Sequence, residues 1–270
     1  MSRICFINIQ KEQVSNRFIS ASRKVLEQAK RTDTEIAMKS PIRGPETHSQ
    51  MANLYGLFLT SGEIIERILE AEKEAFDAVV VNGTLDTYLG IPQARCVVNI
   101  PLISPSEATM LFSCLLGRKF GLVALGAPYL RPFMGSIISN LGLENRAITN
   151  AVRFISISHE DLMTKAIDEP ALIIPEFTEA VADAVADGAE TIIAVGTNLG
   201  VICSLAGISS IDVNGVPVPV LNPLVIALKT AEMMCDLIAM GLPPISRIGL
   251  YRDIGAADLV KLRRHFGLNA

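Results

Sequence analysis

The sequence lacks a surplus of basic residues, and this absence removes one broad class of function. Its 270 residues include 24 Lys and Arg against 28 Asp and Glu, which gives a formal net charge of −4. A protein that binds nucleic acid needs a positively charged face, so no nucleic-acid partner is expected. Half of the residues are apolar, and the chain has no run of like charges, which excludes a disordered chain.

Paired cysteines and clustered histidines are also missing. An odd number of scattered cysteines with no CxxC pair is typical of reduced thiols, so a cytoplasmic location is expected. The three histidines form no HExxH or HxH pattern, so we expect no metal site. The N-terminus lacks the apolar run and cleavage site of a signal peptide. The five cysteines are Cys5, Cys96, Cys114, Cys203 and Cys235.

A single uncharged stretch is long enough to raise the question of a membrane span. Residues 191–211 have about the length of a spanning helix. They contain Asn198 and several glycines, serines and threonines in place of a leucine-rich block. A buried strand, a loop and a short helix fit this composition better, so no membrane partner is expected.

What the sequence does contain is a regular alternation of apolar β-branched runs with helical patterns. A length of 270 residues suits one large domain or two small lobes. Strand and helix in alternation predict βαβ units, and hence an α/β fold with parallel sheets. The runs that predict strands include residues 3–9, 76–83, 96–103, 119–125, 153–158, 191–196 and 215–223.

Several helix boundaries can be predicted from local chemistry. Thr60 with Glu63, and Ser104 with Glu107, have the spacing of a capping box at the start of a helix. Near the C-terminus, residues 256–266 are amphipathic. This last helix either docks on its own lobe or clasps a neighbouring subunit, and docking is favoured because amphipathicity requires only some apolar partner.

The chain contains a weak internal sequence repeat. Residues 76–90 and 189–203 both contain the end of a helix, a buried strand and then a Gly-Thr pair. Their glycines, Gly83 and Gly196, lie 113 positions apart, close to half of the chain. This predicts two similar lobes that face each other across a ligand cleft.

The two Gly-Thr pairs, 83–84 and 196–197, predict a binding site. In parallel α/β sheets ligands bind at the carboxyl ends of strands, where both pairs are expected. Glycine permits close approach of the backbone, and the threonine donors suit a carboxylate or another oxyanion. Asn82 and Asn198 add amide groups. The alternative is that Gly and Thr are ordinary turn residues.

Further segments follow one another in a recognisable order: Asn8, the Gly44-Pro45 turn, AVVVNGTLD (78–86), ISPSEA (103–108), GRKFGLVAL (117–125), DGAETIIAVG (187–196) and GVPV (215–218). Together they resemble the hydantoin racemase branch of the aspartate/glutamate racemase superfamily over about residues 3 to 235. The resemblance implies two Rossmann-like lobes related by a pseudo-twofold axis, a small substrate between them and no cofactor.

Members of that family use two cysteines, one in each lobe, as acid and base on opposite faces of a carbon acid. The resemblance places these cysteines on Gly83 and Gly196, so both are absent here. Glycine can neither accept nor donate the proton, so the two-base chemistry cannot simply be carried over. The two glycines also free space for a ligand bulkier than an amino acid.

The favoured interpretation is a racemase- or isomerase-like enzyme that acts on a small carboxylate or cyclic amide through an enolate-like intermediate. One alternative is a lyase or hydrolase, because one branch of the superfamily, which resembles arylmalonate decarboxylases, uses a Gly-Thr corner as an oxyanion site. The second alternative is a protein that only binds a small acid or amide.

The candidate catalytic residues are Thr84, Thr197, Asp86 and His159. The hydroxyl group of a threonine is a poor base unless another group activates it. The alternative to a catalytic role is a helix cap for Asp86 and an ordinary position at the start of a helix for His159. The expected substrate-binding residues are Asn8, Gln10, Asn82, Gly83, Gly196 and Asn198.

Chain order predicts how the lobes are assembled. Residues 1–101 and 217–242 form the first lobe, residues 102–216 the second, and 243–270 a helical extension. Two crossings between lobes would act as hinges that allow closure on a ligand. The apolar composition and the extra helix predict a homo-oligomer.

Overall fold

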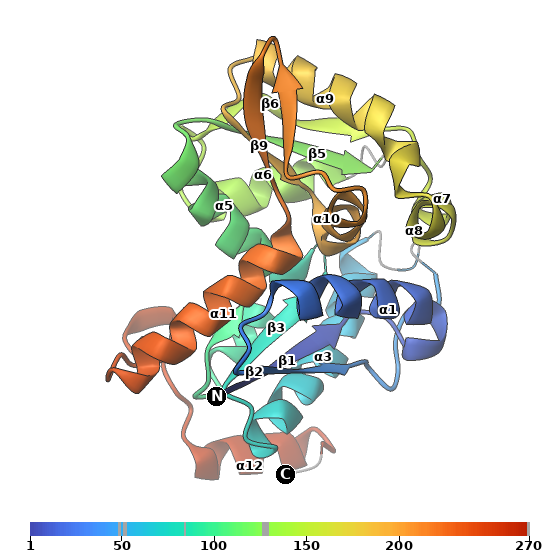
Figure 1. Ribbon diagram of the computed structural model, residues 1–270. Coiled ribbons are helices and arrows are strands. Elements are labelled where there is room, and N and C mark those ends of the chain that lie inside the picture. Colours follow the sequence, from blue (N-terminus) through green and yellow to red (C-terminus); the bar gives the residue numbers. More distant parts are fainter. Residues whose placement is uncertain (48–49, 51–52, 84, 126–129, 269–270) are drawn as a thin grey trace.

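The computed structural model describes residues 1–47, 50, 53–83, 85–125 and 130–268, and these form two α/β lobes, one above the other in Figure 1. The first lobe holds a four-stranded parallel sheet in the order β2-β1-β3-β4. Its strands are β1 (Ser2–Asn8), β2 (Thr34–Lys39), β3 (Ala78–Asn82) and β4 (Leu102–Ile103). The predicted α/β class is confirmed.

The second lobe repeats this strand order. Its sheet runs β6-β5-β7-β9-β8, with only the edge strand β8 antiparallel. The order 6-5-7-9 matches 2-1-3-4 strand for strand, so β3 and β7 occupy equivalent places. The strands are β5 (Phe120–Leu125), β6 (Ala147–Ile155), β7 (Thr191–Ala194), β8 (Ser210–Val213) and β9 (Val216–Leu221).

Helices cover the outer faces of both sheets (Figure 1). Those of the first half are α1 (Glu12–Ala29), α3 (Leu54–Lys73), η1 (Asp86–Tyr88), α4 (Ile91–Ala94) and α5 (Pro105–Leu116). The second lobe adds α6 (Leu130–Asn140), α7 (His159–Met163), α8 (Lys165–Asp168), η2 (Pro170–Ile173), α9 (Ile174–Ala186) and α10 (Gly196–Leu205). The chain ends with α11 (Pro223–Ala239), η3 (Gly249–Tyr251) and α12 (Ala256–His265).

The chain passes between the lobes twice. β4 pairs with β3 in the first sheet, and β9 pairs with β7 in the second. The crossings therefore lie after Ile103 and after Leu221, a few residues beyond the predicted boundaries at 101/102 and 216/217. After the return crossing, α11 packs against the first sheet, where its Leu224 and Leu228 join the cluster that contains Phe6.

The core runs through both lobes. The strands β1, β3, β5 and β7 are buried on both faces, as expected for parallel strands covered by helices. One apolar cluster includes Ile7 and Val81 of the first sheet together with Leu122 and Ile193 of the second. The lobes are thus packed on each other, and separate clusters fill their remaining faces.

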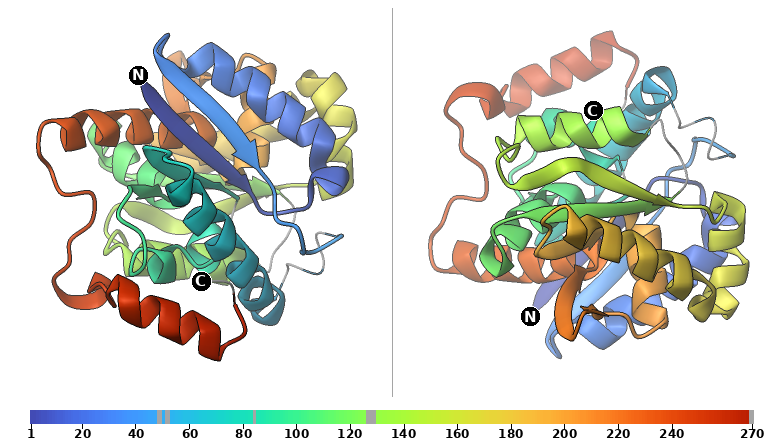
Figure 2. Two further views of the ribbon diagram at one scale, coloured as in Figure 1. Left: turned by 90° about the horizontal axis from the view of Figure 1, so that it is seen from below. Right: turned by 90° about the horizontal axis from the view of Figure 1, so that it is seen from above.

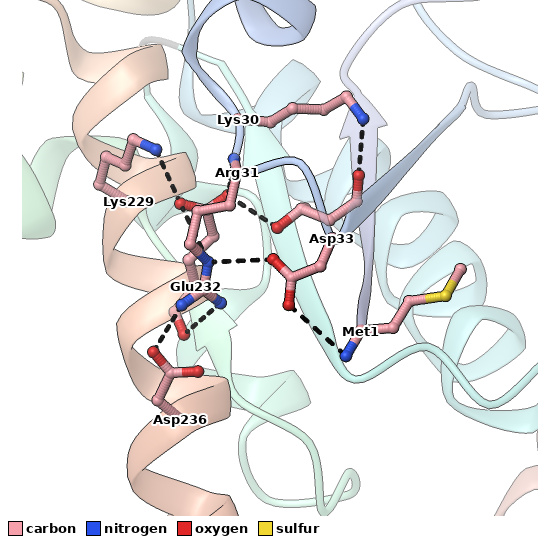
Figure 3. A network of polar contacts seen from close by, with 8 residues as sticks. Met1, Lys30, Arg31, Asp33, Lys229, Glu232 and Asp236 are labelled. Carbon is pink, nitrogen blue, oxygen red and sulfur yellow. Dashed lines mark hydrogen bonds and ion pairs between the residues drawn. The ribbon is translucent and has the colours of Figure 1, made fainter.

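A buried carboxylate fixes α11 to the first lobe (Figure 3). Glu232 accepts hydrogen bonds from the Arg31 backbone N–H (2.8 Å), the Thr34 hydroxyl (2.8 Å) and the Lys229 ammonium (2.9 Å). Burial alone would raise the pKa of Glu232, but these hydrogen bonds outweigh it and hold the pKa below its ordinary value. The ionised carboxylate therefore joins α11 to the turn between α1 and β2.

The C-terminal extension runs along one side of the molecule and docks on the first lobe (Figure 2). Arg263 in α12 donates two hydrogen bonds to Glu66 in α3, at 2.8 and 2.7 Å. This contact to its own lobe agrees with the favoured interpretation of the extension. No residue of α12 is buried, and Leu262 and Phe266 stay 44% and 75% exposed.

Three local expectations are corrected or resolved. Residues 96–103 form no long strand, because only Leu102–Ile103 pair with β3. Thr60 lies inside α3, where its hydroxyl donates to the Gly56 carbonyl, and the N-cap is Asn53. The stretch 191–211 divides into β7, α10 and the start of β8. Among the described residues, no helix is both long and apolar enough to cross a membrane.

Candidate functional site

The carboxyl edge of the first sheet brings two of the predicted binding residues together. Asn8 and Asn82 end β1 and β3 and form the last register pair between these strands. The Asn82 Nδ2 donates to Asn8 Oδ1 at 3.0 Å, and Asn8 Nδ2 donates to the Ser40 hydroxyl at 3.1 Å. Three neighbouring strands thus end in a linked row of buried or half-buried polar side chains.

The far end of this row is incomplete. Asn82 is 2% exposed, and its Oδ1 is buried without a hydrogen-bond partner in the described part of the chain. An unsatisfied buried carbonyl costs roughly 1–3 kcal/mol. Because parallel α/β sheets bind ligands at this edge, the unsatisfied oxygen makes Asn82 a candidate ligand contact.

Gly83 follows immediately and makes a tight bend, in which its N–H donates to the Val81 carbonyl at 3.0 Å. The space beside it is filled. A Cβ at this position would lie 2.7 Å from Ile9 Cγ2 and 3.4 Å from Leu89 Cδ1. The expectation that this glycine frees room for a bulkier ligand is therefore wrong, because Ile9, the residue directly after β1, occupies that room.

Asp86 is held at the start of a helix other than its own. Its Oδ2 accepts hydrogen bonds from the Ser104 hydroxyl (2.6 Å) and the Ser106 backbone N–H (3.1 Å), in the first turn of α5. The side chain is completely buried. Burial raises the pKa of the carboxyl to about 6, although the hydrogen bonds from Ser104 and Ser106 act in the opposite direction.

Unsatisfied polar groups are concentrated in this segment. Three of the seven buried side-chain atoms without a partner among the described residues are Asn82 Oδ1, Asp86 Oδ1 and Thr87 Oγ1. All three lie within residues 82–87, a segment that begins with the last residue of β3. Native proteins leave few such groups, and a cluster of them at a strand end is typical of a functional site.

The second Gly-Thr pair, Gly196 and Thr197, differs in geometry from the first. Gly196 begins α10 with a φ of +85°, a conformation that strains residues with a side chain. Thr197 is buried, and Asn198 Oδ1 accepts a hydrogen bond from the Leu199 N–H at 2.9 Å. α10 packs against α1 of the first lobe, and its Val201 lies in the apolar cluster that contains Phe6. The N-terminal turn of α10 offers backbone donors.

The remaining candidates are more dispersed. Gln10 is buried just after β1, and His159 is half-buried at the start of α7, which packs against α1 and α10. Thr84 lies outside the described residues. Burial raises the pKa of the Cys5 and Cys203 thiols to about 12, so these cysteines pack in the core and stay protonated.

Sequence reasoning missed Ile9, Ser40, Thr87 and the serine partners of Asp86. Ser40 had a usable signal, since it is the small polar residue directly after an expected strand, like Asn8 and Asn82. Ile9 had none, because an isoleucine at the end of an apolar run gives no sign that it fills the space beside a residue 74 positions away.

Two lobes with matching, mostly parallel sheets define a class of two-lobed α/β proteins. Comparison with known proteins identifies the family within this class. The model of the Asp/Glu/hydantoin racemase family matches residues 14–231. The chain therefore belongs to this racemase and isomerase family. A search of curated proteins found no match.

Solved structures show the same fold. An allantoin racemase from Klebsiella pneumoniae is similar over 94% of both chains, with a TM-score of 0.73 and 18% identity. An allantoin racemase from Pseudomonas fluorescens is similar over 93% of this chain and 96% of that one, with a TM-score of 0.68 and 21% identity. A glutamate racemase from Thermus thermophilus is similar over 92% of this chain and 84% of that one, with a TM-score of 0.52 and 15% identity.

Proposed function

We propose that the protein is a cofactor-independent isomerase-like enzyme that moves a proton on a small carboxylate or cyclic amide through an enolate-like intermediate. The cluster of unsatisfied buried groups at 82–87 carries the proposal, because it lies at the carboxyl edge of the first sheet, the edge at which parallel α/β folds bind their ligands. Family membership and the two allantoin racemases of similar fold support the class of reaction.

The proton carrier in this proposal is Asp86, since the thiols at the family positions are replaced by glycine. A carboxyl with a pKa of about 6 is nearer to neutrality than an ordinary aspartate, which suits proton transfer at physiological pH. Its Oδ1 is the oxygen left free by Ser104 and Ser106. His159 and Thr197, from the second lobe, are the candidates for the opposite side, and the backbone donors at Gly196 stabilise the developing oxyanion.

A lyase or hydrolase on the same corners is the first alternative, favoured by the helix N-terminus at Gly196, which suits an oxyanion without acting as a base. A protein that only binds a small acid or amide is the second. It is favoured by the complete burial of Asp86 and by its two hydrogen bonds to α5, which are those of a helix cap.

Proton NMR in deuterated buffer separates these functions. The purified chain is incubated with hydantoins, amino acids and 2-substituted malonates. Loss of an α-proton signal from an intact compound supports the proposal, and a new compound points to a lyase or hydrolase. Ligands that bind without any change point to a binding protein.

The Asp86→Asn variant tests the assigned proton carrier. Removal of a general acid or base lowers the exchange rate by about 100-fold or more. The exposed Asp183→Asn in α9 is the matched control and keeps the wild-type rate. An Asp86→Asn variant that folds and exchanges at the wild-type rate contradicts the role of Asp86.

A further inference from the structure

We propose that the strap, defined as residues 243–255 of the C-terminal extension, is a positioning element of the candidate site: it holds the start of α5, and α5 in turn holds Asp86. Its two positioning residues are Arg247 and Tyr251, which act through Arg95. This inference rests on the proposed function, which gives Asp86 the proton-carrying role. The match to the family model ends at residue 231, so it does not include the strap.

Arg247 anchors the strap, which connects α11 to α12 (Figure 2), to the turn after α4. Its guanidinium donates hydrogen bonds to the carbonyl oxygens of Arg95 (2.7 Å) and Val98 and to Oδ1 of Asn99 (2.7 Å). The carbonyls at the end of a helix have no partner within that helix. A planar guanidinium with five donors can bind several such groups at once. The strap therefore fixes the backbone of residues 95–99.

Arg95 extends this restraint to β4 and α5. Its guanidinium donates to the Leu102 carbonyl at 3.1 Å and to Oε2 of Glu107 at 2.6 Å. Tyr251 of the strap completes the arrangement, because its hydroxyl accepts a hydrogen bond from Arg95 at 3.3 Å. The guanidinium carbon of Arg95 also lies 5.6 Å from the centre of the tyrosine ring. The Arg95 side chain is only 16% exposed, so these contacts determine its position.

The first turn of α5 connects this restraint to Asp86. Ser104 caps the helix by accepting a hydrogen bond from the Glu107 N–H at 3.0 Å, and its hydroxyl donates to Asp86 Oδ2 at 2.6 Å. The Ser106 N–H donates to the same oxygen at 3.1 Å. Glu107 is thus bound to Arg95 by its side chain and to Ser104 by its backbone. A shift of Glu107 therefore displaces both donors of Asp86.

Release of the strap has a predictable electrostatic effect on Asp86. The hydrogen bonds from Ser104 and Ser106 lower the pKa of this carboxyl, whereas burial raises it. η1 packs against α3, α4 and α5, and the charged group that acts on Asp86 from these helices is Glu107, which raises the pKa. Arg95 neutralises Glu107. Weaker donors and a less neutralised Glu107 act in the same direction, so the pKa of Asp86 rises when the strap is released.

The first test compares Arg247→Ala with Arg252→Ala, which removes an exposed arginine of the same strap, in the full-length chain. The titration of Asp86 is followed by ¹³C NMR on protein labelled at the aspartate carboxyl carbon, and its resonance is the one absent from Asp86→Asn. We expect the midpoint to rise by at least about 0.5 pH unit in Arg247→Ala. Arg252→Ala should keep the wild-type midpoint. A loss of global stability alone would not move it.

Tyr251→Ala tests the same path and leaves the arginine anchor in place. The neighbouring Leu250→Ala, at a side chain that is 80% exposed, is the matched control. Amide hydrogen exchange of Ser106 and Glu107, whose N–H groups donate within the first turn of α5, is measured in addition to the midpoint. Tyr251→Ala should raise the midpoint and speed the exchange of both amides by about 3-fold or more, and Leu250→Ala should do neither. If the Arg247 variant does not fold, this pair decides alone.

An Asp86 midpoint that is unchanged or lowered in both strap variants overturns the inference. These readouts need no substrate, so they are independent of the proposed activity. If proton exchange on a substrate depends on Asp86 but its pH profile is the same in the strap variants, the positioning role alone is refuted. If the midpoint rises as expected but no compound loses an α-proton, the proposed activity alone is refuted.

Discussion

At the scale of single residues, the pair Gly83 and Ile9 shows how tightly the chain is packed just after β3. Ile9 is β-branched, and its Cγ2 lies 2.7 Å from where a Cβ at position 83 would stand. Branching at Cβ makes χ1 stiff, so this methyl group cannot swing away freely. Placing any side chain at position 83 therefore requires a change at Ile9 as well.

We expect Gly83→Ala to lower the free energy of unfolding by about 1–3 kcal/mol, because it overpacks the space held by Ile9. The double variant Gly83→Ala/Ile9→Ala should be more stable than the sum of the two single changes predicts. Urea unfolding of the four proteins measures this coupling. Gly62→Ala, where a Cβ meets nothing within 4 Å, is the control and should not be destabilised. Strict additivity would contradict the contact.

Asp86 predicts a pH dependence of stability. Its folded-state pKa of about 6 lies above the ordinary aspartate pKa of 3.8, so between these values the folded state binds more protons than the unfolded state. The free energy of unfolding therefore falls as the pH rises from about 4 to 6, by up to about 3 kcal/mol.

Asp86→Asn is expected to remove this part of the fall and to match or exceed the wild type in stability at pH 7.5. Urea unfolding at pH 4.5 and 7.5 compares the two, with Asp183→Asn as control. A variant that keeps the wild-type difference between the two pH values would show that Asp86 does not titrate in this range.

At the scale of elements, local sequence predicted the strands better than the helix starts. Continuous apolar runs predicted β1, β3, β5 and β7, since strands covered on both faces need apolar residues at every position. The run 96–103 was wrongly predicted to be a strand throughout. Its first apolar residues lie in the turn after α4, and they are apolar because this turn is packed in the core, where Val98 is fully buried. α3 begins at Leu54 because Asn53 caps it, a signal hidden by exposed apolar residues in its first turns.

The Glu232 cluster provides a prediction for α11. Glu232→Gln keeps the shape of the side chain but removes the negative charge that accepts hydrogen bonds from three donors. The substitution should lower the free energy of unfolding by about 1–3 kcal/mol at pH 7. Asp236→Asn, on the same helix and 56% exposed, should cost less than about 1 kcal/mol.

The acid side supplies a second check on the same cluster. The folded-state pKa of Glu232 is depressed, so its contribution is present above the unfolded-state pKa and disappears as the pH falls through the lowered value. The wild type should therefore lose its advantage over Glu232→Gln below about pH 4. Equal stability of the two at pH 7 would show that the cluster adds nothing.

At the scale of the whole molecule, the weak internal sequence repeat predicted two similar lobes. The matching strand orders of the two sheets explain why the sequence repeats. The positions of both corners after β3 and β7 followed from that repeat. The contacts that shape the candidate site did not. Asp86 meets Ser104, and Gly83 meets Ile9, through tertiary packing that leaves no periodic trace in the sequence.

Homo-oligomerisation stays a prediction, and α5 offers a surface to test it. Leu111, Phe112, Leu115 and Leu116 share one exposed face of the helix, with Leu115 79% exposed. Light scattering on the wild type should give a multiple of 29.1 kDa. Leu111→Asp/Leu115→Asp should reduce the mass, and Leu172→Asp, at an exposed leucine of η2, should not. A wild-type monomer would contradict the prediction.

The double crossing of the chain has a consequence for biosynthesis. The last strand of the first sheet, β4, ends at Ile103, but the apolar face that α11 covers stays open until Ala239 is synthesised, 136 residues later. At about 5–20 residues per second this interval lasts roughly 7–27 s. During that time Ile4 and Phe6 lack part of their native cover, so the nascent chain exposes an apolar surface that favours aggregation.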